Sequence, residues 1–397
     1  MPSAISYRIP EATFLARLNF ATSARVLHTM TDRIADAICG LLHPDERMTM
    51  TTILDSQGGD LRALPRGAYL DLSTCVNRYG PPPSVWEALR SVRPAQLAAH
   101  PYGMDELFVE TYAKFMAAEP KHLLPGRGIT EFIRILADLL PTHGTAVITP
   151  DYTDTIRLFP VHLPPAPGAV DSAAARLERV DAAMATYPYV MLSNPNNPLG
   201  VYVPGHDLAE ICRSHPGSVL IVDEAYIEFL IDHAGLSMVN CGLENVVVLR
   251  SPNKLFGIAG TRTGALWTRN ADLAGAVAAR KINWCLSYLD VVAATTALAD
   301  VAWADRTRAA LLEDAGDLER LLAANFPDIV SGVPVHYRFL PSADPVAAHR
   351  YFLERGVAVR ALDGSKPGRV AGVRVTTPTT AELAEIKERF ASRLEVG

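Results

Sequence analysis

The sequence predicts an α/β layer fold followed by a smaller α+β domain. Five short apolar runs are rich in β-branched residues, helical patterns lie between several of them, and the pattern changes after about residue 290. The runs are 145–149, 189–193, 219–223, 246–249 and 264–268, and the helical patterns are 103–118, 128–140, 206–214 and 271–282. Apolar strands separated by helices indicate a sheet that is buried on both faces.

The first 65 residues stand apart, and we expect residues 1–65 to form a helical arm. Apolar side chains between residues 11 and 42 recur at helical spacing, and His43-Pro44 is a stop signal. Residues 56–59 and 65–67 have the glycine and proline content of loops. Two interpretations stay open: the arm packs on the body or on a partner subunit, or its helix covers its own domain.

The rest of the chain is expected to form a large domain over residues 66–289 and a small one over residues 290–397. With 397 residues the chain is long enough for two cores. For the small domain the pattern predicts a long helix at 290–325, strands at 334–340, 357–361 and 370–376, and an amphipathic helix at 380–394.

Composition and charge are those of an ordinary globular protein. Apolar residues make up 49% and charged residues 20% of the chain, with a formal net charge of −6. This balance gives no support to binding of nucleic acid or anionic membranes as the main role.

The cysteines and the N-terminus indicate a cytoplasmic protein. The five cysteines are odd in number and scattered without a Cys-x-x-Cys pair, which argues against a disulfide framework and a metal site of the zinc type. No basic-then-apolar signal peptide is present, and no run reaches the roughly 18 apolar residues of a membrane span.

The stretch 250–262 contains a lysine in surroundings that suit a covalent role. Ser251 lies three residues before Lys254, and Arg262 lies eight residues after it. A nucleophilic lysine must lose its proton near neutral pH, and the apolar, glycine-containing residues 256–260 would desolvate it. Taken alone, a surface lysine in a loop is the more common explanation.

Asp223 ends the apolar run 219–223, so its carboxylate is expected at the carboxyl edge of the sheet, where ligands bind. A buried carboxylate there needs a cationic partner, and a protonated pyridine nitrogen is such a partner. Tyr226, three residues later, is a candidate donor to the 3'-oxygen of such a ring. The alternative is an aspartate that caps a helix or turn.

Two further side chains follow strands of the same predicted sheet. Asn197 lies in the loop 194–200, where two prolines and a glycine hold its amide rigidly, so it is a second candidate donor to the ring oxygen. Tyr152 follows the strand 145–149 and is a candidate to stack on the ring. The alternatives are a plain turn for the asparagine and a loop aromatic that covers the core for the tyrosine.

The remaining candidate residues are expected to bind anionic groups. The glycine-rich turn 126–128 opens a helical stretch, where free N–H groups and the helix dipole favour phosphate, and Ser251 and Arg262 would complete such a site. Arg374 lies in an apolar strand and needs a partner, either a substrate carboxylate or a structural salt bridge. Each signal is weak alone. Together they supply the contacts that pyridoxal 5'-phosphate (PLP) requires.

The chain resembles the class I and II aminotransferases, which are PLP enzymes of fold type I, and in particular their histidinol-phosphate aminotransferase-like branch. The resemblance runs from about Asp71 to the C-terminus. It rests on Asn77-Arg-Tyr-Gly-Pro81, Pro101-Tyr-Gly103 and residues 126–131, 194–200, 223–226, 251–262 and 372–376. It implies a large domain with a mixed, mostly parallel seven-stranded sheet between helices, and a smaller α+β C-terminal domain.

The resemblance also implies roles for individual residues. Lys254 would form the Schiff base with PLP, Asp223 would pair with the pyridinium nitrogen, and Tyr226 would complete the catalytic set. The other assignments are Asn197 and Tyr226 at the 3'-oxygen, Tyr152 at the stacking position, Gly128, Ile129, Thr130, Ser251 and Arg262 around the phosphate, and Arg374 with Asn197 at the substrate carboxylate. Tyr79 would reach the phosphate of a neighbouring subunit, which implies a homodimer with shared active sites.

Three departures from the family pattern concern the site and the N-terminus. Pro252 and Asn253 precede the lysine where Ser or Thr is usual, although Asn253 can still donate to phosphate. Arg127 stands between two glycines and is a candidate substrate contact, whereas core packing is expected for two other candidates, Trp284 and Tyr288. The N-terminal arm is longer than is usual in the family.

The predicted function is the transfer of an amino group between an amino acid, or a related amine, and a 2-oxo acid in amino-acid metabolism. A lyase, decarboxylase or oxidase on the same scaffold stays open, because these enzymes share the cofactor contacts. A PLP-sensing transcriptional regulator is disfavoured, because the first 65 residues are neither basic nor long enough for a DNA-binding domain and linker.

Overall fold

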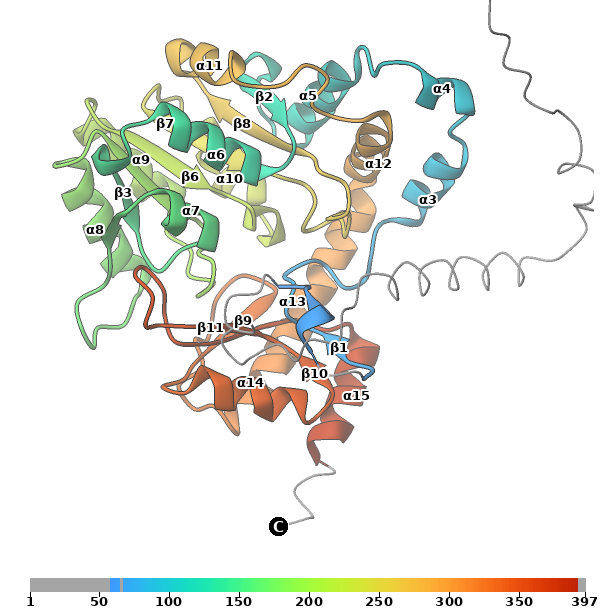
Figure 1. The fold of residues 1–397 in the computed structure, drawn as a ribbon, viewed down its shortest axis with the longest axis vertical. Helices are drawn as coiled ribbons and strands as arrows, with labels where there is room; N and C mark the ends of the chain where they lie inside the picture. The colour runs from blue at the N-terminus through green and yellow to red at the C-terminus, as the bar shows by residue number, and fades with distance from the viewer. Residues whose placement is uncertain (1–57, 65–66, 392–397) are drawn as a thin grey trace, which may run out of the picture. The chain divides into compact units, whose positions relative to one another are not determined.

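The structure is a computed structural model that describes residues 58–64 and 67–391 (Figure 1). Its largest sheet has seven strands in the order β2-β8-β7-β6-β5-β3-β4. The strands are β2 (Leu123–Gly126), β3 (Thr145–Ile148), β4 (Val161–Leu163), β5 (Tyr189–Ser193), β6 (Val219–Asp223), β7 (Val246–Arg250) and β8 (Gly264–Thr268). β3 to β7 are parallel, and β8 is antiparallel to both of its neighbours. The predicted α/β fold class with a mixed, mostly parallel sheet is confirmed.

The sheet is buried on both faces because its central strands are apolar at successive positions. In β7, Val246 and Val248 belong to the core on one face, whereas Val247 and Leu249 belong to the core on the other. The first core includes helices α5 (Met104–Phe115) and α12 (Tyr288–Ala299), and the second includes α6 (Ile129–Leu139). Alternate side chains of the same strand therefore pack into different cores, one on each face of the sheet.

The single helix predicted at 290–325 is wrong. Asp300 leaves the helical conformation, and its side chain accepts a hydrogen bond from the backbone N–H of Trp303, so α12 ends and α13 begins there. The other helices are α3 (Pro83–Arg90), α4 (Pro94–Ala98), α7 (Thr153–Leu158), α8 (Ala173–Met184), α9 (Gly205–Ser214), α10 (His233–Leu236), α11 (Ala271–Ala278), α13 (Val301–Ala323), α14 (Pro345–Leu353) and α15 (Thr380–Ala391).

The C-terminal part contains a separate antiparallel sheet with the order β11-β12-β9. Its strands are β9 (Tyr337–Pro341), β11 (Arg360–Leu362) and β12 (Gly372–Thr376). The strand predicted at 357–361 is divided, because β10 (Val357–Ala358) pairs in parallel with β1 (Leu70–Asp71) instead of continuing into β11. Figure 1 shows the blue β1 beside β10 among the red and orange elements.

The segment that follows β1 forms hydrogen bonds both to β12 and to the turn after β7. Leu72 belongs to the C-terminal core, and its carbonyl accepts a hydrogen bond from the N–H of Thr376 at 2.9 Å. Asn77 donates its N–H to the carbonyl of Lys254 at 2.9 Å and its side-chain amide to the carbonyl of Leu255 at 2.7 Å. Residues 70–77 therefore contact both the antiparallel sheet and the turn after β7, and the domain boundaries at 66 and 290 stay predictions.

The helix predicted within residues 11–42 lies outside the described residues, as does most of the proposed arm. At the end of that arm, the N–H of Gly59 donates to the hydroxyl of Ser73 at 2.8 Å. No helix in residues 58–64 and 67–391 combines the length and the hydrophobicity of a membrane span.

Candidate active site

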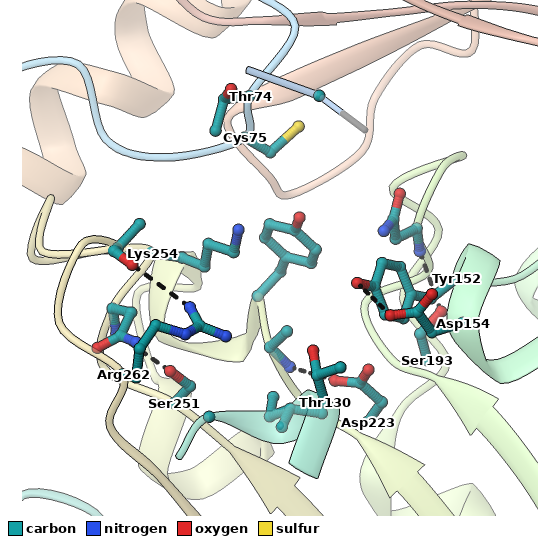
Figure 2. Close-up of a pocket in the computed structure, with 18 of the residues that line it drawn as sticks. Thr74, Cys75, Thr130, Tyr152, Asp154, Ser193, Asp223, Ser251, Lys254 and Arg262 are labelled. Carbon is teal, nitrogen blue, oxygen red and sulfur yellow. Dashed lines mark hydrogen bonds between the residues drawn. The ribbon is translucent and has the colours of Figure 1, made fainter. Parts of the chain in front are cut away.

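Four parallel strands end at one edge of the large sheet, and a cavity of about 370 Å³ lies there (Figure 2). Tyr152 follows β3, Asn197 follows β5, Asp223 ends β6 and Lys254 follows β7. This is the edge at which open α/β sheets bind their ligands. Of the residues that the resemblance assigns to the cofactor and the substrate carboxylate, all except Tyr79 line the cavity: Gly128, Ile129, Thr130, Tyr152, Asn197, Asp223, Tyr226, Ser251, Lys254, Arg262 and Arg374.

Lys254 extends its side chain into this cavity from the turn after β7 (Figure 2). Burial lowers the pKa of its ammonium, and the guanidinium groups of Arg374 and Arg262 lower it further, while Asp223 opposes them. The lowered pKa makes the neutral amine, the form that a nucleophile or a base requires, easier to reach than in a free lysine. The surface-lysine alternative is therefore wrong for this residue.

Asp223 is 4% exposed at the end of β6. Its carboxylate accepts a hydrogen bond from the N–H of Ala225 at 2.9 Å, and it forms no salt bridge with another described residue. Burial, and next the negative charge of Asp151, raise the pKa of Asp223 to about 7. A carboxylate held in this way is stabilised by a cation, so this wall of the cavity fits a pyridinium nitrogen.

The opposite end of the cavity fits a phosphate group. Gly128 has φ +75°, and a Cβ at this position would lie 3.0 Å from Nη2 of Arg262. The guanidinium thus approaches the backbone at the start of α6, where the N–H groups of Ile129 and Thr130 have no partner within the helix. A helix N-terminus and an arginine together favour a bound dianion.

The loop that carries Lys254 and Arg262 is closed by its own polar side chains. The hydroxyl of Ser251 donates to the carbonyl of Thr263 at 2.7 Å, and the amide of Asn253 donates to the carbonyl of Thr261 at 2.8 Å. Asn253, a predicted phosphate donor, therefore also fixes the loop itself. These bonds hold the amine and the guanidinium in one rigid unit.

Arg374 connects the small sheet with the loop after β5. Its Nη1 donates to the side-chain oxygen of Asn197 at 2.5 Å, and its Nη2 donates to the carbonyl of Ser73 at 3.1 Å. Among the described residues its hydrogen-bond partners are uncharged oxygens, so the structural salt bridge considered as an alternative is absent there. The guanidinium keeps its charge available for an anion in the cavity.

A second, smaller cavity of about 50 Å³ adjoins the first and shares Tyr152, Asn197 and Arg374 with it. Arg360 and Arg369 also line it, and Arg360 stands opposite Arg374 in the register of β11 and β12. Three guanidinium groups therefore surround a space that opens from the main cavity.

Several cavity residues are absent from the sequence prediction. Ser193 ends β5, and a polar residue at the end of an apolar strand is the same signal that identifies Asp223. Thr74 and Cys75 follow β1, and Gly58 belongs to the N-terminal segment, where no local pattern indicates a role. The others are Asp154, Ala225 and Ala259.

Tyr79 lies outside the cavity of its own chain. It is 38% exposed, and its hydroxyl donates to Oδ2 of Asp314 at 2.7 Å and contacts the hydroxyl of Thr380 at 2.8 Å. Its contact with the phosphate of a neighbouring subunit involves a second chain and stays a prediction.

The three candidate substrate contacts lie in a separate surface groove. Core packing is wrong for Trp284, which is 42% exposed and stacks on His100 with ring centroids 4.4 Å apart. Tyr288 is half-buried, and the exposed Arg127 donates from Nη1 to the carbonyl of Cys285 at 3.1 Å. None of the three lines the cavity that contains Lys254.

Residues 68–390 match the family described as "Aminotransferase class I and II". The chain belongs to this aminotransferase family. It is 28% identical to a histidinol-phosphate aminotransferase of Rhodospirillum centenum, over 85% of this chain and 95% of that one. It is 30% identical to the same-named enzyme of Leuconostoc mesenteroides, over 58% of this chain and 66% of that one.

The fold of this aminotransferase is also found in solved structures. The histidinol-phosphate aminotransferase of Sinorhizobium meliloti, solved in complex with pyridoxal-5'-phosphate, superposes with a TM-score of 0.71 at 19% identity, covering 89% of this chain and 99% of that one. A structure of L-threonine-O-3-phosphate decarboxylase from Porphyromonas gingivalis superposes with a TM-score of 0.63 at 18% identity. The match covers 82% of this chain and 99% of that one. The fold alone therefore does not determine the reaction.

Family membership confirms several predictions for this aminotransferase. Fold type I, PLP as the cofactor and transamination with amino-acid and 2-oxo-acid substrates are confirmed at the level of the family. The wall around Asp223 and the phosphate end at Gly128 fit this cofactor by their own chemistry. The roles of the individual residues stay predictions.

Proposed function

We propose that Lys254 holds PLP in this aminotransferase and carries the proton at the substrate α-carbon. The observation that supports this best is that one cavity contains an amine whose pKa is lowered and a buried carboxylate whose pKa is raised. Bound PLP supplies the electron sink for a carbanion at that carbon. The neutral Nζ of Lys254 accepts the α-proton and later returns it, a transfer worth roughly 10²–10⁴-fold in rate.

The other residues that line the cavity would bind PLP and orient its ring. The carboxylate of Asp223 stabilises a positive charge on the ring nitrogen. Tyr226 is buried, which raises its pKa well above 10, so its phenol keeps the proton that it donates to a ring oxygen. Tyr152 covers the ring and excludes water. Phosphate contacts are proposed for Gly128, Ile129, Thr130, Ser251 and Arg262.

The amino donor is proposed to carry an anionic group that Arg374 binds. Arg360 and Arg369 line the adjoining cavity, so a phosphate monoester is a suitable substituent as well as a carboxylate. Histidinol phosphate, after which the relatives above are named, has this chemistry. We therefore propose a donor of this class, with a 2-oxo acid as the acceptor.

Replacing Arg374 with alanine should raise KM for the donor by roughly 10²-fold, with a smaller loss in kcat, because the lost interaction binds substrate and transition state alike. Arg369→Ala should raise KM for histidinol phosphate and leave KM for histidinol unchanged. The control is Arg320→Ala, on the exposed surface of α13. Steady-state kinetics with both donors tests this, and equal wild-type KM values for the two donors would contradict the proposed donor class.

We also propose that the enzyme is a cytoplasmic homodimer in which Tyr79 completes the site of its partner. Trp86, Leu97, Tyr102 and Trp284 are large apolar side chains exposed on this chain. Surfaces of this kind are typical of interfaces between subunits. The exposure of Tyr79, outside its own cavity, supports the same arrangement.

Mixing two inactive variants tests the shared site. Lys254→Ala and Tyr79→Ala, unfolded and refolded together, should regain activity, because one site of each heterodimer then contains both a lysine and its partner's tyrosine. Each variant refolded alone is the control. If Tyr79 acts only within its own chain, the mixture stays inactive, and light scattering that gives a monomer would exclude the dimer directly.

A further inference from the structure

Asp151 is a buried carboxylate at the point where the loops after β3 and β5 meet. Its side chain is 1% exposed. Its Oδ1 accepts a hydrogen bond from the N–H of Tyr152 at 2.7 Å. Its Oδ2 accepts two more, from the N–H of Ser193 at 2.7 Å and from the hydroxyl of Ser193 at 2.9 Å. Both oxygens therefore act as acceptors. Oδ1 binds the loop after β3 and Oδ2 binds the end of β5.

The hydroxyl of Ser193 continues this contact across the cavity wall. Its oxygen accepts a hydrogen bond from the N–H of Asn197 at 3.1 Å, and the amide oxygen of Asn197 accepts one from Arg374 at 2.5 Å. A continuous series of hydrogen bonds thus leads from Asp151 to Arg374. Figure 2 shows Tyr152 and Ser193 together on one side of the cavity, with Lys254 and Arg262 on the other.

Charged groups on two neighbouring elements face this carboxylate. Nη2 of Arg176, a fully buried residue of α8, lies 3.9 Å from Oδ2 of Asp151, and Nη1 of Arg176 lies 2.7 Å from Asp171. Asp223 approaches from β6. Burial raises the pKa of Asp151 to about 6, although Arg176 and the hydrogen bonds from Ser193 and Tyr152 lower it. Above that pH the group is a fixed anion.

We propose that Asp151 is a positioning residue that holds the ring-stacking Tyr152 and the anion-binding pair Asn197 and Arg374 in one geometry. The inference rests on the proposed roles of those three residues. A carboxylate is required, because an asparagine would turn a donor N–H₂ group toward either the N–H of Tyr152 or the two donors of Ser193. Replacing a residue that orients a ligand-binding group in this way commonly lowers ligand affinity or activity, although the residue does not touch the ligand.

Two variants distinguish the contact of Asp151 with Tyr152 from its contact, through Ser193, with Asn197 and Arg374. Asp151→Asn should raise KM for the amino donor by roughly 10- to 100-fold, with a smaller loss in kcat. It should also weaken the binding of pyridoxine 5'-phosphate to the apoprotein by about tenfold. That probe lacks the aldehyde and cannot form a Schiff base with Lys254. Its affinity therefore measures only the non-covalent contacts with the residues that line the cavity. Ser193→Ala should raise KM but leave the affinity for the probe near that of wild type, because the bond to Tyr152 is kept.

The double variant and a distant control complete the test. Asp151→Asn combined with Ser193→Ala should be no worse in KM than Asp151→Asn alone, because both act through one series of bonds. Glu319→Gln breaks a 2.6 Å ion pair with Arg338 and serves as a destabilised control that should change neither KM nor probe affinity. Fully additive effects, an unchanged Asp151→Asn, or equal changes in the control would each overturn the inference.

Failure of the proposed function gives a different result. If wild-type apoprotein does not bind pyridoxine 5'-phosphate, or if borohydride reduction leaves Lys254 without cofactor, the proposed site is wrong and the role of Asp151 is wrong with it. If wild type binds the probe and is labelled at Lys254, but Asp151→Asn behaves like wild type, only the positioning role is wrong.

Discussion

Replacing Lys254 with alanine is expected to abolish transamination, together with the absorbance band of lysine-bound PLP. The amine both holds the cofactor and carries the α-proton, and the proton transfer alone is worth roughly 10²–10⁴-fold in rate. Turnover and the visible spectrum, measured after reconstitution with PLP, check this result. A small primary amine added to the solution should restore part of the lost turnover, because it replaces the missing base.

A lysine outside the site provides the matched control. Lys121 pairs with Glu119 on the surface, where its side chain is 69% exposed, so Lys121→Ala should keep both turnover and absorbance. Borohydride reduction of the wild type, followed by peptide mapping, should find the cofactor on Lys254. A yellow and active Lys254→Ala protein would show that another amine holds PLP.

Replacing Asp223 with asparagine should lower kcat by roughly 10²–10³-fold, because the site loses the preorganised charge that stabilises the ring cation. The side chain keeps its size, so the loss measures charge and not packing. Asp317→Asn, a surface carboxylate on α13, is the control. A kcat within a few-fold of wild type would mean that the ring nitrogen has another partner.

The same substitution should change how the stability of the apoprotein depends on pH. The pKa of Asp223 is about 7 in the fold, against an ordinary value of 3.8. Between these values the folded chain holds a proton that the unfolded chain has released. The free energy of unfolding therefore falls as pH rises from about 4 to about 7, by about 4 kcal/mol at most.

Denaturant unfolding of the apoprotein across this pH range measures the effect. In Asp223→Asn the free energy of unfolding should depend less on pH. The variant apoprotein should be more stable than wild type at neutral pH and equally stable near pH 4. The charges of Asp151, Lys254 and Glu224 act on this carboxylate. The pKa of Asp151 is itself raised to about 6, so Asp151→Asn should remove a further part of the pH dependence. An unchanged slope in both variants would show that these carboxylates keep their ordinary pKa values.

The central strands were predictable because burial on both faces requires continuous apolar runs, and β5, β6 and β7 have them. The two strands that the prediction lacks, β2 and β4, are the edges of the sheet. Edge strands tolerate a proline, as at Pro125, and partly exposed positions, as throughout β4, so their sequences lack that pattern.

The site was predictable for a related reason. Parallel strands bring their carboxyl ends to one edge, so polar residues such as Asp223, Asn197 and Lys254 could be assigned to it before any contact was known. Thr74 and Cys75 could not, because tertiary pairing of a distant segment brings them there. Asp151 has the sequence pattern of an ordinary turn residue, and only its three accepted hydrogen bonds distinguish it.

The parallel pairing of β1 with β10 has a consequence for synthesis of the chain. Leu70 pairs with Val357, so β1 leaves the ribosome long before the strand with which it pairs. Contacts of such long sequence separation form slowly, and the unpaired edge is exposed meanwhile. The nascent chain can therefore complete its large sheet first, whereas the region around Arg374 forms only after β10 has been synthesised.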